Sequence, residues 1–205
     1  RLSAGLERYR FVLIYGAGGV AKNLLLFLES YIDKNRIAVV ISKVKRDEEL
    51  LAGYSVMQID HFTEVRDQVM VILAVMPRLA AEMGEYVRKL GFENFMTAEE
   101  ISRQLYDEIW QTEISKNKIV FSSFAGGGFG GNGKYIALEL LKRSQKLDMV
   151  WVVKKKGMEF PDGIREVVYG TYEHYWELGT ARIWIDNQHK NFFTRKRNGQ
   201  CYIQT

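Results

Sequence analysis

Two glycine-rich segments of this sequence have the composition of loops that bind phosphate groups. Residues 16–21 read Gly-Ala-Gly-Gly-Val-Ala, and residues 125–133 contain six glycines. Glycine allows a tight turn and a close approach of the backbone to a ligand. The N-terminus of a following helix adds free N–H groups and a partial positive charge. Both segments are therefore candidates for binding an anionic group.

The first segment offers a candidate nucleotide site made of Gly16, Gly18, Gly19 and Ala21. An apolar run precedes it and a helical pattern follows, as the GxGxxA dinucleotide fingerprint requires. A nicotinamide site also needs an acidic residue at the end of the second strand, where this sequence has Ser42 and Lys43. An NAD(P) site is therefore disfavoured, although a 2′-phosphate could meet Lys43, Lys45 and Arg46. A purely architectural loop and a nucleotide-sugar site both stay open.

The second segment offers candidate residues for binding an anionic substrate, namely Gly127, Gly128, Gly130, Gly131, Asn132 and Lys134. Its amides can form an anion-binding nest, because it joins an expected strand to an expected helix. Asn132 is placed to cap that helix. Lys134 puts a cation at the helix start, which is unfavourable unless an anion binds there. The alternative is a flexible surface loop with a solvated lysine.

Three further candidates, Asp186, Asn187 and His189, follow an apolar run near the end of the chain. Ligands gather beyond the carboxyl ends of strands in open α/β sheets, so these residues are candidates for ligand binding. The competing interpretation is turn formation, capping and a solvated histidine. A nearby basic cluster fits either a solvated face or a polyanionic ligand; it consists of Lys190, Arg195, Lys196 and Arg197.

Composition excludes several classes of protein. The net charge of +4 and the pI near 9.0 suit anionic substrates or an anionic membrane surface, but they are too weak to indicate nucleic acid. The single cysteine, Cys201, allows no intrachain disulfide, and we expect it to be a buried strand residue. The three histidines lie far apart in sequence, which predicts no metal site. No apolar run is long enough for a membrane span.

Alternating strand and helix patterns must position these residues. In the first half, strands are expected at 11–15, 37–41, 69–75 and 94–96, with helices after residue 19 and from Pro77 to about Gly91. A helix over 98–116 connects to a second half. There, strands are expected at 118–123, 149–153, 166–169, 181–186 and 201–205, with helices at 135–144 and 172–178.

This rhythm predicts an α/β protein with two Rossmann-like parallel sheets. We expect a Rossmann-like domain at 1–97, a connecting helix at 98–116 and a second domain at 117–205.

From about Lys118 to Thr205 the sequence resembles the CDP-glycerol:glycerophosphate glycerophosphotransferases of teichoic acid and capsular polymer synthesis. The resemblance lies in separated motifs in a fixed order: Asn-Gly-Lys-Tyr at 132–135, Val-Trp-Val-Val at 150–153, 172–176, Ala-Arg-Ile-Trp-Ile-Asp-Asn at 181–187 and Gly-Gln-Cys-Tyr-Ile-Gln-Thr at 199–205. In that family the Tyr-Ile-Gln-Thr strand runs into Trp-His-Gly, whose histidine is regarded as catalytic. The resemblance therefore implies an N-terminal half-domain without the catalytic residue, inactive alone.

The resemblance also implies a GT-B-like fold, with the CDP-glycerol site mostly in the other half and the acceptor on this half. It implies an anionic polymer or lipid-linked glycan acceptor and CDP-glycerol as the donor substrate, and it identifies no cofactor. It also implies a cytoplasmic location with peripheral contact at the inner face of the membrane. Some relatives transfer ribitol phosphate instead of glycerol phosphate, and the sequence does not exclude that reaction. The competing classes are an NAD(P)-dependent oxidoreductase built on the first loop, and a non-catalytic module that binds a nucleotide-sugar or a partner.

Overall fold

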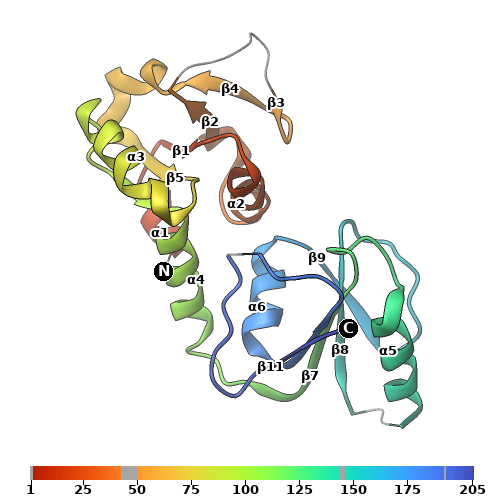
Figure 1. The fold of residues 1–205 in the computed structure, drawn as a ribbon. Helices are drawn as coiled ribbons and strands as arrows, with labels where there is room; N and C mark the ends of the chain where they lie inside the picture. Colours follow the sequence, from red (N-terminus) through yellow and green to blue (C-terminus); the bar gives the residue numbers. More distant parts are fainter. Residues whose placement is uncertain (1, 43–49, 144–145, 192) are drawn as a thin grey trace. The chain divides into compact units, whose positions relative to one another are not determined.

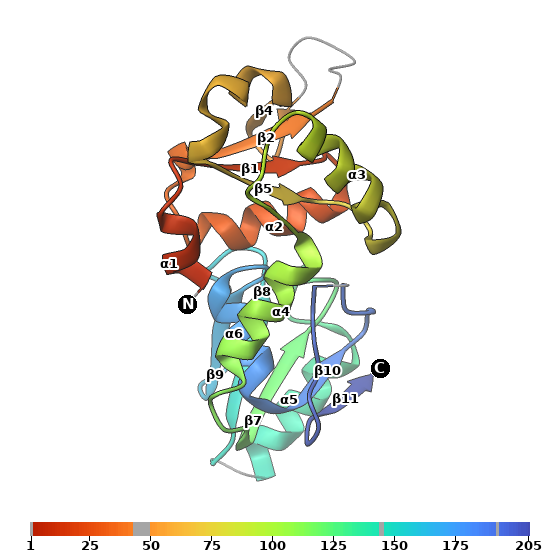
Figure 2. The same cartoon turned by 90° about the vertical axis from the view of Figure 1, so that its left-hand side faces the viewer.

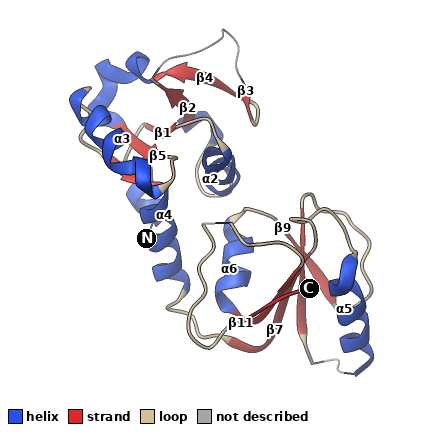
Figure 3. Cartoon of the chain, in the orientation of Figure 1, coloured by secondary structure: helices blue, strands red, loops and turns tan. Residues whose placement is uncertain are grey.

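The computed structural model describes residues 2–42, 50–143, 146–191 and 193–205 (Figure 1). The chain divides into two compact units, with the boundary between Leu105 and Tyr106. Strands and helices alternate in each unit (Figure 3). Among the described residues, no helix has both the length and the apolar character that crossing a bilayer requires.

The first unit is built on a mainly parallel sheet with the strand order β3-β4-β2-β1-β5-β6. Only β3 and β4 pair antiparallel among its described strands. Its elements are α1 (Leu2–Glu7), β1 (Phe11–Tyr15), α2 (Gly19–Glu29), η1 (Lys34–Arg36), β2 (Ile37–Ile41), β3 (Leu50–Leu51), β4 (Tyr54–Gln58), η2 (Ile59–Gln68), β5 (Val69–Leu73), α3 (Pro77–Lys89) and β6 (Phe95–Thr97). Helix α4 (Ala98–Ile109) contains the boundary between the two units. Helices α2 and α3 cover opposite faces of this sheet (Figures 1 and 2).

The second unit has a sheet of order β11-β10-β7-β8-β9 in which every described pair is parallel. Its elements are β7 (Ser115–Ser122), α5 (Gly131–Arg143), β8 (Asp148–Val153), β9 (Ile164–Val168), α6 (Tyr172–Thr180), β10 (Ala181–Asp186) and β11 (Cys201–Gln204). The central strands β7 and β8 contain apolar runs rather than alternating patterns, because residues such as Ile119–Phe121 and Met149–Val153 are buried on both faces of the sheet.

Two apolar layers hold the second unit together. On one face, α5 packs against side chains such as Phe121 and Trp151, whose rings stack 5.5 Å apart. On the other face, Leu178 of α6 packs against Val150 and Trp184. Helices α5 and α6 thus cover opposite faces of the sheet (Figure 1). The predicted α/β class with two parallel sheets is confirmed.

Three details differ from the expectations. The helix expected over 98–116 ends at Ile109, and β7 already begins at Ser115, because a turn closed by the Thr112 N–H bond to the Ile109 carbonyl intervenes. Cys201 is exposed rather than buried, since β11 is the edge strand of its sheet. The sequence analysis did not predict five short elements, namely α1, η1, β3, β4 and η2.

Candidate functional site

The carboxyl ends of β7 and β10 form the point at which the strand order of the second sheet reverses. The two strands are adjacent and in register, with Ser122 opposite Asp186, so both end at the same level. From β7 the chain turns away through α5 to β8 on one side, while β10 and β11 occupy the other side. Open α/β sheets bind their ligands at such a switch point. The glycine loop that follows β7 and the segment that follows β10 therefore meet at these carboxyl ends, which we call the switch-point edge.

A direct hydrogen bond joins these two segments. The Phe124 N–H donates to Oδ1 of Asn187 over 2.8 Å. On the other side of the loop, a Cβ at Gly131 would lie 3.6 Å from Nδ2 of the same asparagine. Asn187 therefore holds the start of the glycine loop and also lies close to the point where the loop enters α5.

Three further hydrogen bonds fix the glycine loop along its length. The Ser123 hydroxyl donates to the Gly130 carbonyl over 2.8 Å, and Nε1 of Trp151 donates to the Gly128 carbonyl over 3.1 Å. The Lys154 N–H donates to the carbonyl of Gly126 over 3.0 Å. These bonds tie the loop to the buried core and to the end of β8. This ordered geometry favours a shaped binding surface over the flexible loop of the alternative interpretation.

A left-handed turn opens the loop. Phe124, Ala125 and Gly126 have φ values of 51°, 50° and 81°. Left-handed conformations cost roughly 1–2 kcal/mol for each non-glycine residue, and such strain concentrates at functional sites. Glycine is required at the third position, because a Cβ there would lie 2.7 Å from the carbonyl carbon of Val153. The turn leaves the Phe124 side chain 57% exposed at the edge of the sheet.

Helix α5 begins at Gly131, earlier than expected. Asn132 is therefore an exposed residue of the first turn and not the cap that the sequence suggested, because the glycines continue into the helix. Lys134 lies in the same turn, with Nζ 5.5 Å from the centre of the Phe129 ring. That ring packs edge-on against Trp151 at 4.6 Å. The buried aromatic cluster thus positions the lysine near the helix N-terminus.

Beyond β10, Asp186 organises the second segment. Its carboxylate is buried, and it accepts hydrogen bonds from the Gln188 N–H at 3.1 Å and from Nζ of Lys190 at 2.6 Å. Burial lowers the pKa of Lys190, and the neighbouring Asp186 opposes that shift. His189 is exposed and lines a small cavity with this ion pair. The bond from the Gln188 N–H shows that Asp186 also stabilises the turn after β10, as the competing interpretation proposed.

Basic side chains surround the edge. Lys154, Lys155 and Lys156 follow the carboxyl end of β8 and are all exposed. The first of them is tied to the glycine loop through its backbone. Together with Lys134 they give this edge a positive charge that attracts anionic ligands.

The sequence model of one protein family, described as CDP-Glycerol:Poly(glycerophosphate) glycerophosphotransferase, matches residues 104–205. Residues 104–205 belong to this family. A similar protein is the teichoic acid poly(glycerol phosphate) polymerase of Staphylococcus epidermidis, which is 30% identical over 105 residues, covering 50% of this chain and 15% of the polymerase. The chain thus spans about a seventh of that relative.

Solved structures of the wall teichoic acid polymerase TagF resemble the chain in part. A CDPG-soaked variant has a TM-score of 0.48 and 22% identity, covering 64% of this chain and 32% of that one. Another structure of the same polymerase has a TM-score of 0.46 and 20% identity, over 64% of this chain and 31% of the other.

The first unit lies almost entirely outside the matched glycerophosphotransferase region. Its own glycine loop follows β1 at the switch point between β1 and β5. Gly16 has a φ of 124°, and a Cβ there would lie 3.0 Å from the Ala74 carbonyl oxygen, so this glycine serves the packing of the two strands. Ala21 is fully buried. Gly18 and Gly19 are exposed and leave the start of α2 open.

The basic residues that could meet a 2′-phosphate, Lys43, Lys45 and Arg46, lie outside the described residues. The first glycine loop leads into α2, whose N-cap residue, Gly18, makes no side-chain hydrogen bond. No acidic residue follows β2 directly, since Ser42 occupies that place. The geometry thus fits an architectural loop with an open helix N-terminus.

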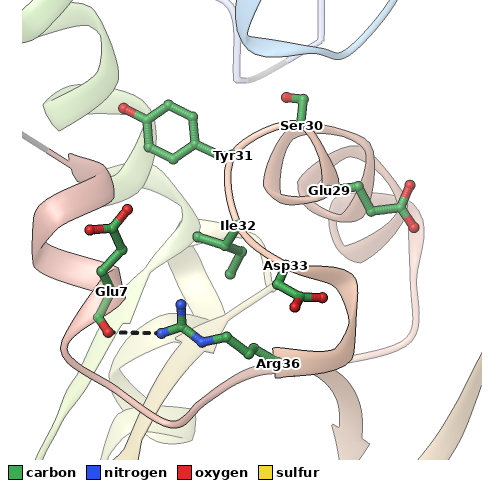
Figure 4. Close-up of a pocket in the computed structure, with 7 residues that line it drawn as sticks. All are labelled: Glu7, Glu29, Ser30, Tyr31, Ile32, Asp33 and Arg36. Atoms are coloured by element: carbon green, nitrogen blue, oxygen red, sulfur yellow. Dashed lines mark hydrogen bonds between the residues drawn. The ribbon is translucent and has the colours of Figure 1, made fainter.

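An open pocket of about 330 Å³ lies elsewhere in the first unit, between the end of α2 and the start of β2 (Figure 4). Glu7, Glu29 and Asp33 line it. Arg36 reaches across it, and its guanidinium donates to the backbone carbonyls of Leu6, Glu7 and Tyr9. Within the described ranges, no group of three His, Cys, Asp or Glu side chains could hold a metal. The arginine ties α1 to the start of β2, which is a structural role.

The sequence analysis did not offer the lysines at 154–156 as site residues, and it also missed His174 of α6. His174 is 1% exposed and lines the same cavity as Asp186 and Lys190. The signal was present in the spacing, because His174 and Leu178 lie four residues apart on a helix and therefore share its buried face. Sequence alone does not show that this face meets the ends of β9 and β10.

Proposed function

We propose that this chain carries the acceptor side of an enzyme that transfers glycerol phosphate from CDP-glycerol to a hydroxyl of a teichoic-acid-type polymer or a lipid-linked primer. The observation that carries the proposal is the family match of residues 104–205 together with the ordered glycine loop at the switch point of that region. CMP is the leaving group of this reaction, and no further cofactor is needed.

The charges at the switch-point edge support an anionic acceptor. The exposed lysines at 154–156 and the half-buried Lys134 surround a loop whose glycines keep its backbone accessible. A chain of phosphodiesters can lie along such an edge, with its phosphates near the lysines and its hydroxyls near the polar side chains of Asn187 and His189. The first unit, in contrast, has exposed glycines at its switch point but no comparable set of lysines among its described residues.

Phosphoryl transfer depends mostly on positioning and on stabilisation of charge at the phosphate oxygens. The residues of this chain are proposed to hold and orient the acceptor, and none of them is assigned as the catalytic base. The same edge would accept a ribitol phosphate polymer, since the recognition groups contact phosphates and hydroxyls common to both. The lysines also favour peripheral contact with the anionic inner face of the membrane.

The test is CMP release from CDP-glycerol by the full-length protein, with glycerol phosphate oligomers as acceptor. A double variant, Lys154→Ala with Lys155→Ala, removes two charges from the edge. The matched control, Lys142→Ala with Arg143→Ala, removes two charges from exposed positions at the carboxyl end of α5. We expect KM for the acceptor to rise about tenfold in the first variant only.

Absence of CMP release from both CDP-glycerol and CDP-ribitol would refute the transferase assignment. Equal effects of the two double variants on KM would refute the placement of the acceptor at this edge.

A further inference from the structure

A small cavity lies beneath the switch-point edge of the second unit. Its lining comes from the left-handed turn after β7, from the end of β9, from α6 and from the segment after β10; the residues include Ala125, Tyr169, His174, Asp186, Lys190 and Asn191. Its volume is about 20 Å³. A water-sized oxygen needs roughly 10–15 Å³ of such space, so the cavity holds one oxygen atom and excludes a phosphate group.

His174 presents a hydrogen-bond donor in this environment. Its Nδ1 accepts a hydrogen bond from the Gly170 N–H at 3.1 Å, so Nδ1 carries no proton. Burial lowers the pKa of His174 to about 3, and the charge of Lys190 adds to the effect, so the ring is neutral. The single proton of the neutral ring therefore sits on Nε2. That buried nitrogen has no hydrogen-bond partner in the described structure.

An unpaired buried N–H is costly, and native proteins rarely leave one without an acceptor. Tyr169 points to the same requirement. Its hydroxyl oxygen already accepts a hydrogen bond from Nδ2 of Asn191 over 3.1 Å, so its own proton is available to a further acceptor. Both residues line the cavity. An oxygen placed there is therefore a candidate partner for the unpaired Nε2–H of His174.

The charge balance of the cavity selects an uncharged oxygen. Asp186 and Lys190 form an ion pair at 2.6 Å with side-chain exposures of 5% and 15%, so their charges largely cancel. An anionic oxygen would gain little from the lysine and would lie close to the carboxylate. A hydroxyl or a water both accepts from His174 and donates to a carboxylate oxygen, which matches the polar groups present.

We propose that this cavity is a hydroxyl subsite: it takes one uncharged oxygen that accepts from Nε2–H of His174, supplied by a water in the free protein and by a polyol hydroxyl when acceptor binds. The polyol part rests on the proposed function, whereas the water part does not. His174 is a positioning residue in this proposal, because it fixes an oxygen beside the loop that is expected to bind the acceptor.

The first test uses NMR on the unmodified chain labelled with ¹⁵N. Long-range ¹H–¹⁵N spectra report which ring nitrogen carries the proton, and cross-relaxation with solvent reports a bound water near it. His61 and His189 are exposed and serve as internal references whose ring protons exchange rapidly. We expect a slowly exchanging Nε2–H signal for His174 with a cross peak to water. A proton on Nδ1, or an Nε2–H without any cross peak to water, would overturn the subsite.

The second test adds glycerol phosphate oligomer, with inorganic phosphate as the comparison probe. We expect the oligomer to shift the Nε2–H signal and to remove the water cross peak, while phosphate leaves both unchanged. A water cross peak that persists at saturating oligomer would assign the oxygen to water alone and overturn the polyol part. A response to inorganic phosphate equal to the response to oligomer would contradict the selection of an uncharged oxygen.

Two variants connect the subsite to activity in the full-length protein. His174→Asn keeps an acceptor near the Gly170 N–H but removes the donor, whereas His174→Gln places an amide N–H near the position of Nε2. We expect KM for the acceptor to rise about tenfold in the asparagine variant. The glutamine variant should recover much of this loss, with kcat changed little in either.

Equal KM values for wild type and His174→Asn would contradict the polyol part even where CMP release is normal. Conversely, if CMP release refuted the transferase assignment, the NMR evidence for a bound water at His174 would still hold. The failures of the two proposals are therefore distinguishable.

Discussion

The five parallel strands of each unit have the same order, but the two units use their glycine loops differently. In both, a central strand (β1 or β7) is followed by a glycine-rich loop and a helix, and the next strands are added first on one side and then on the other. The first loop contains one glycine required by packing and a bare helix N-terminus. The second is held by bonds to Asn187, Trp151 and Lys154 and is bordered by exposed lysines. Both units have an edge of this kind because of their strand order, and we propose that the side chains around the second edge make it a binding surface.

The largest expected effect comes from adding a methyl group at Gly126. Gly126→Ala places a Cβ 2.7 Å from the Val153 carbonyl carbon and 2.8 Å from the Lys154 nitrogen, at a φ of 81°. We expect a loss of about 3 kcal/mol or more in unfolding free energy. All four tryptophans lie in the second unit, so denaturant unfolding followed by their fluorescence reports on that unit alone.

Gly128→Ala is the matched control for this prediction. It has open space within 4 Å of the added carbon and should change stability by less than about 0.5 kcal/mol. Similar losses in both variants would show that the loop is not held at one point by close backbone packing.

A second comparison concerns acid, to which we expect the second unit to respond through a buried ion-pair network. In the second unit, Glu177 accepts from Arg165 at 2.5 and 2.8 Å and from Lys118 at 2.8 Å, while Asp148 accepts from Arg165. Burial raises the pKa of Glu177, but the bonds from Arg165 and Lys118 outweigh it and lower the pKa below its usual value. The Arg165 bond likewise lowers the pKa of Asp148.

Carboxyl groups with lowered pKa values stabilise the fold above their unfolded pKa, which is about 4. That stabilisation is lost as the pH falls through the folded pKa. Tryptophan fluorescence should therefore show the second unit losing stability below about pH 4.

Glu177→Gln should cost on the order of 2 kcal/mol at pH 7 and flatten this dependence. The matched change in the first unit is Glu99→Gln, at an exposed pair with Arg103 3.8 Å away, and it should have little effect. An acid dependence unchanged by Glu177→Gln would contradict this assignment.

A smaller effect is expected at the contact between the two segments of the edge. Asn187→Ala removes the acceptor of the Phe124 N–H, and we expect a loss of about 1–2 kcal/mol in the unfolding free energy of the second unit. Asn132→Ala, at an exposed position of α5, should change it by less than about 0.5 kcal/mol. Losses of equal size would show that Asn187 does not hold the loop.

Much of this architecture could be predicted from the sequence, because apolar runs such as 11–15 and 149–153 mark buried parallel strands without reference to the rest of the chain. The edge residues Asp186 and Asn187 could be placed for the same reason, since they follow such a run. Other features depend on distant partners. The exposure of Cys201 follows from the edge position of β11, and the role of His174 follows from a cavity shared by four segments. Neither is visible in a local pattern.

The most direct test of the central claim is the binding of glycerol phosphate oligomer to this chain by titration calorimetry at low salt. The wild-type chain should bind, the Lys154→Ala, Lys155→Ala variant should bind about tenfold more weakly, and added salt should weaken both. The Lys142→Ala, Arg143→Ala control should bind as the wild type does. Absence of binding by the wild type, or equal weakening in the two variants, would contradict an acceptor site at the carboxyl edge of the second sheet.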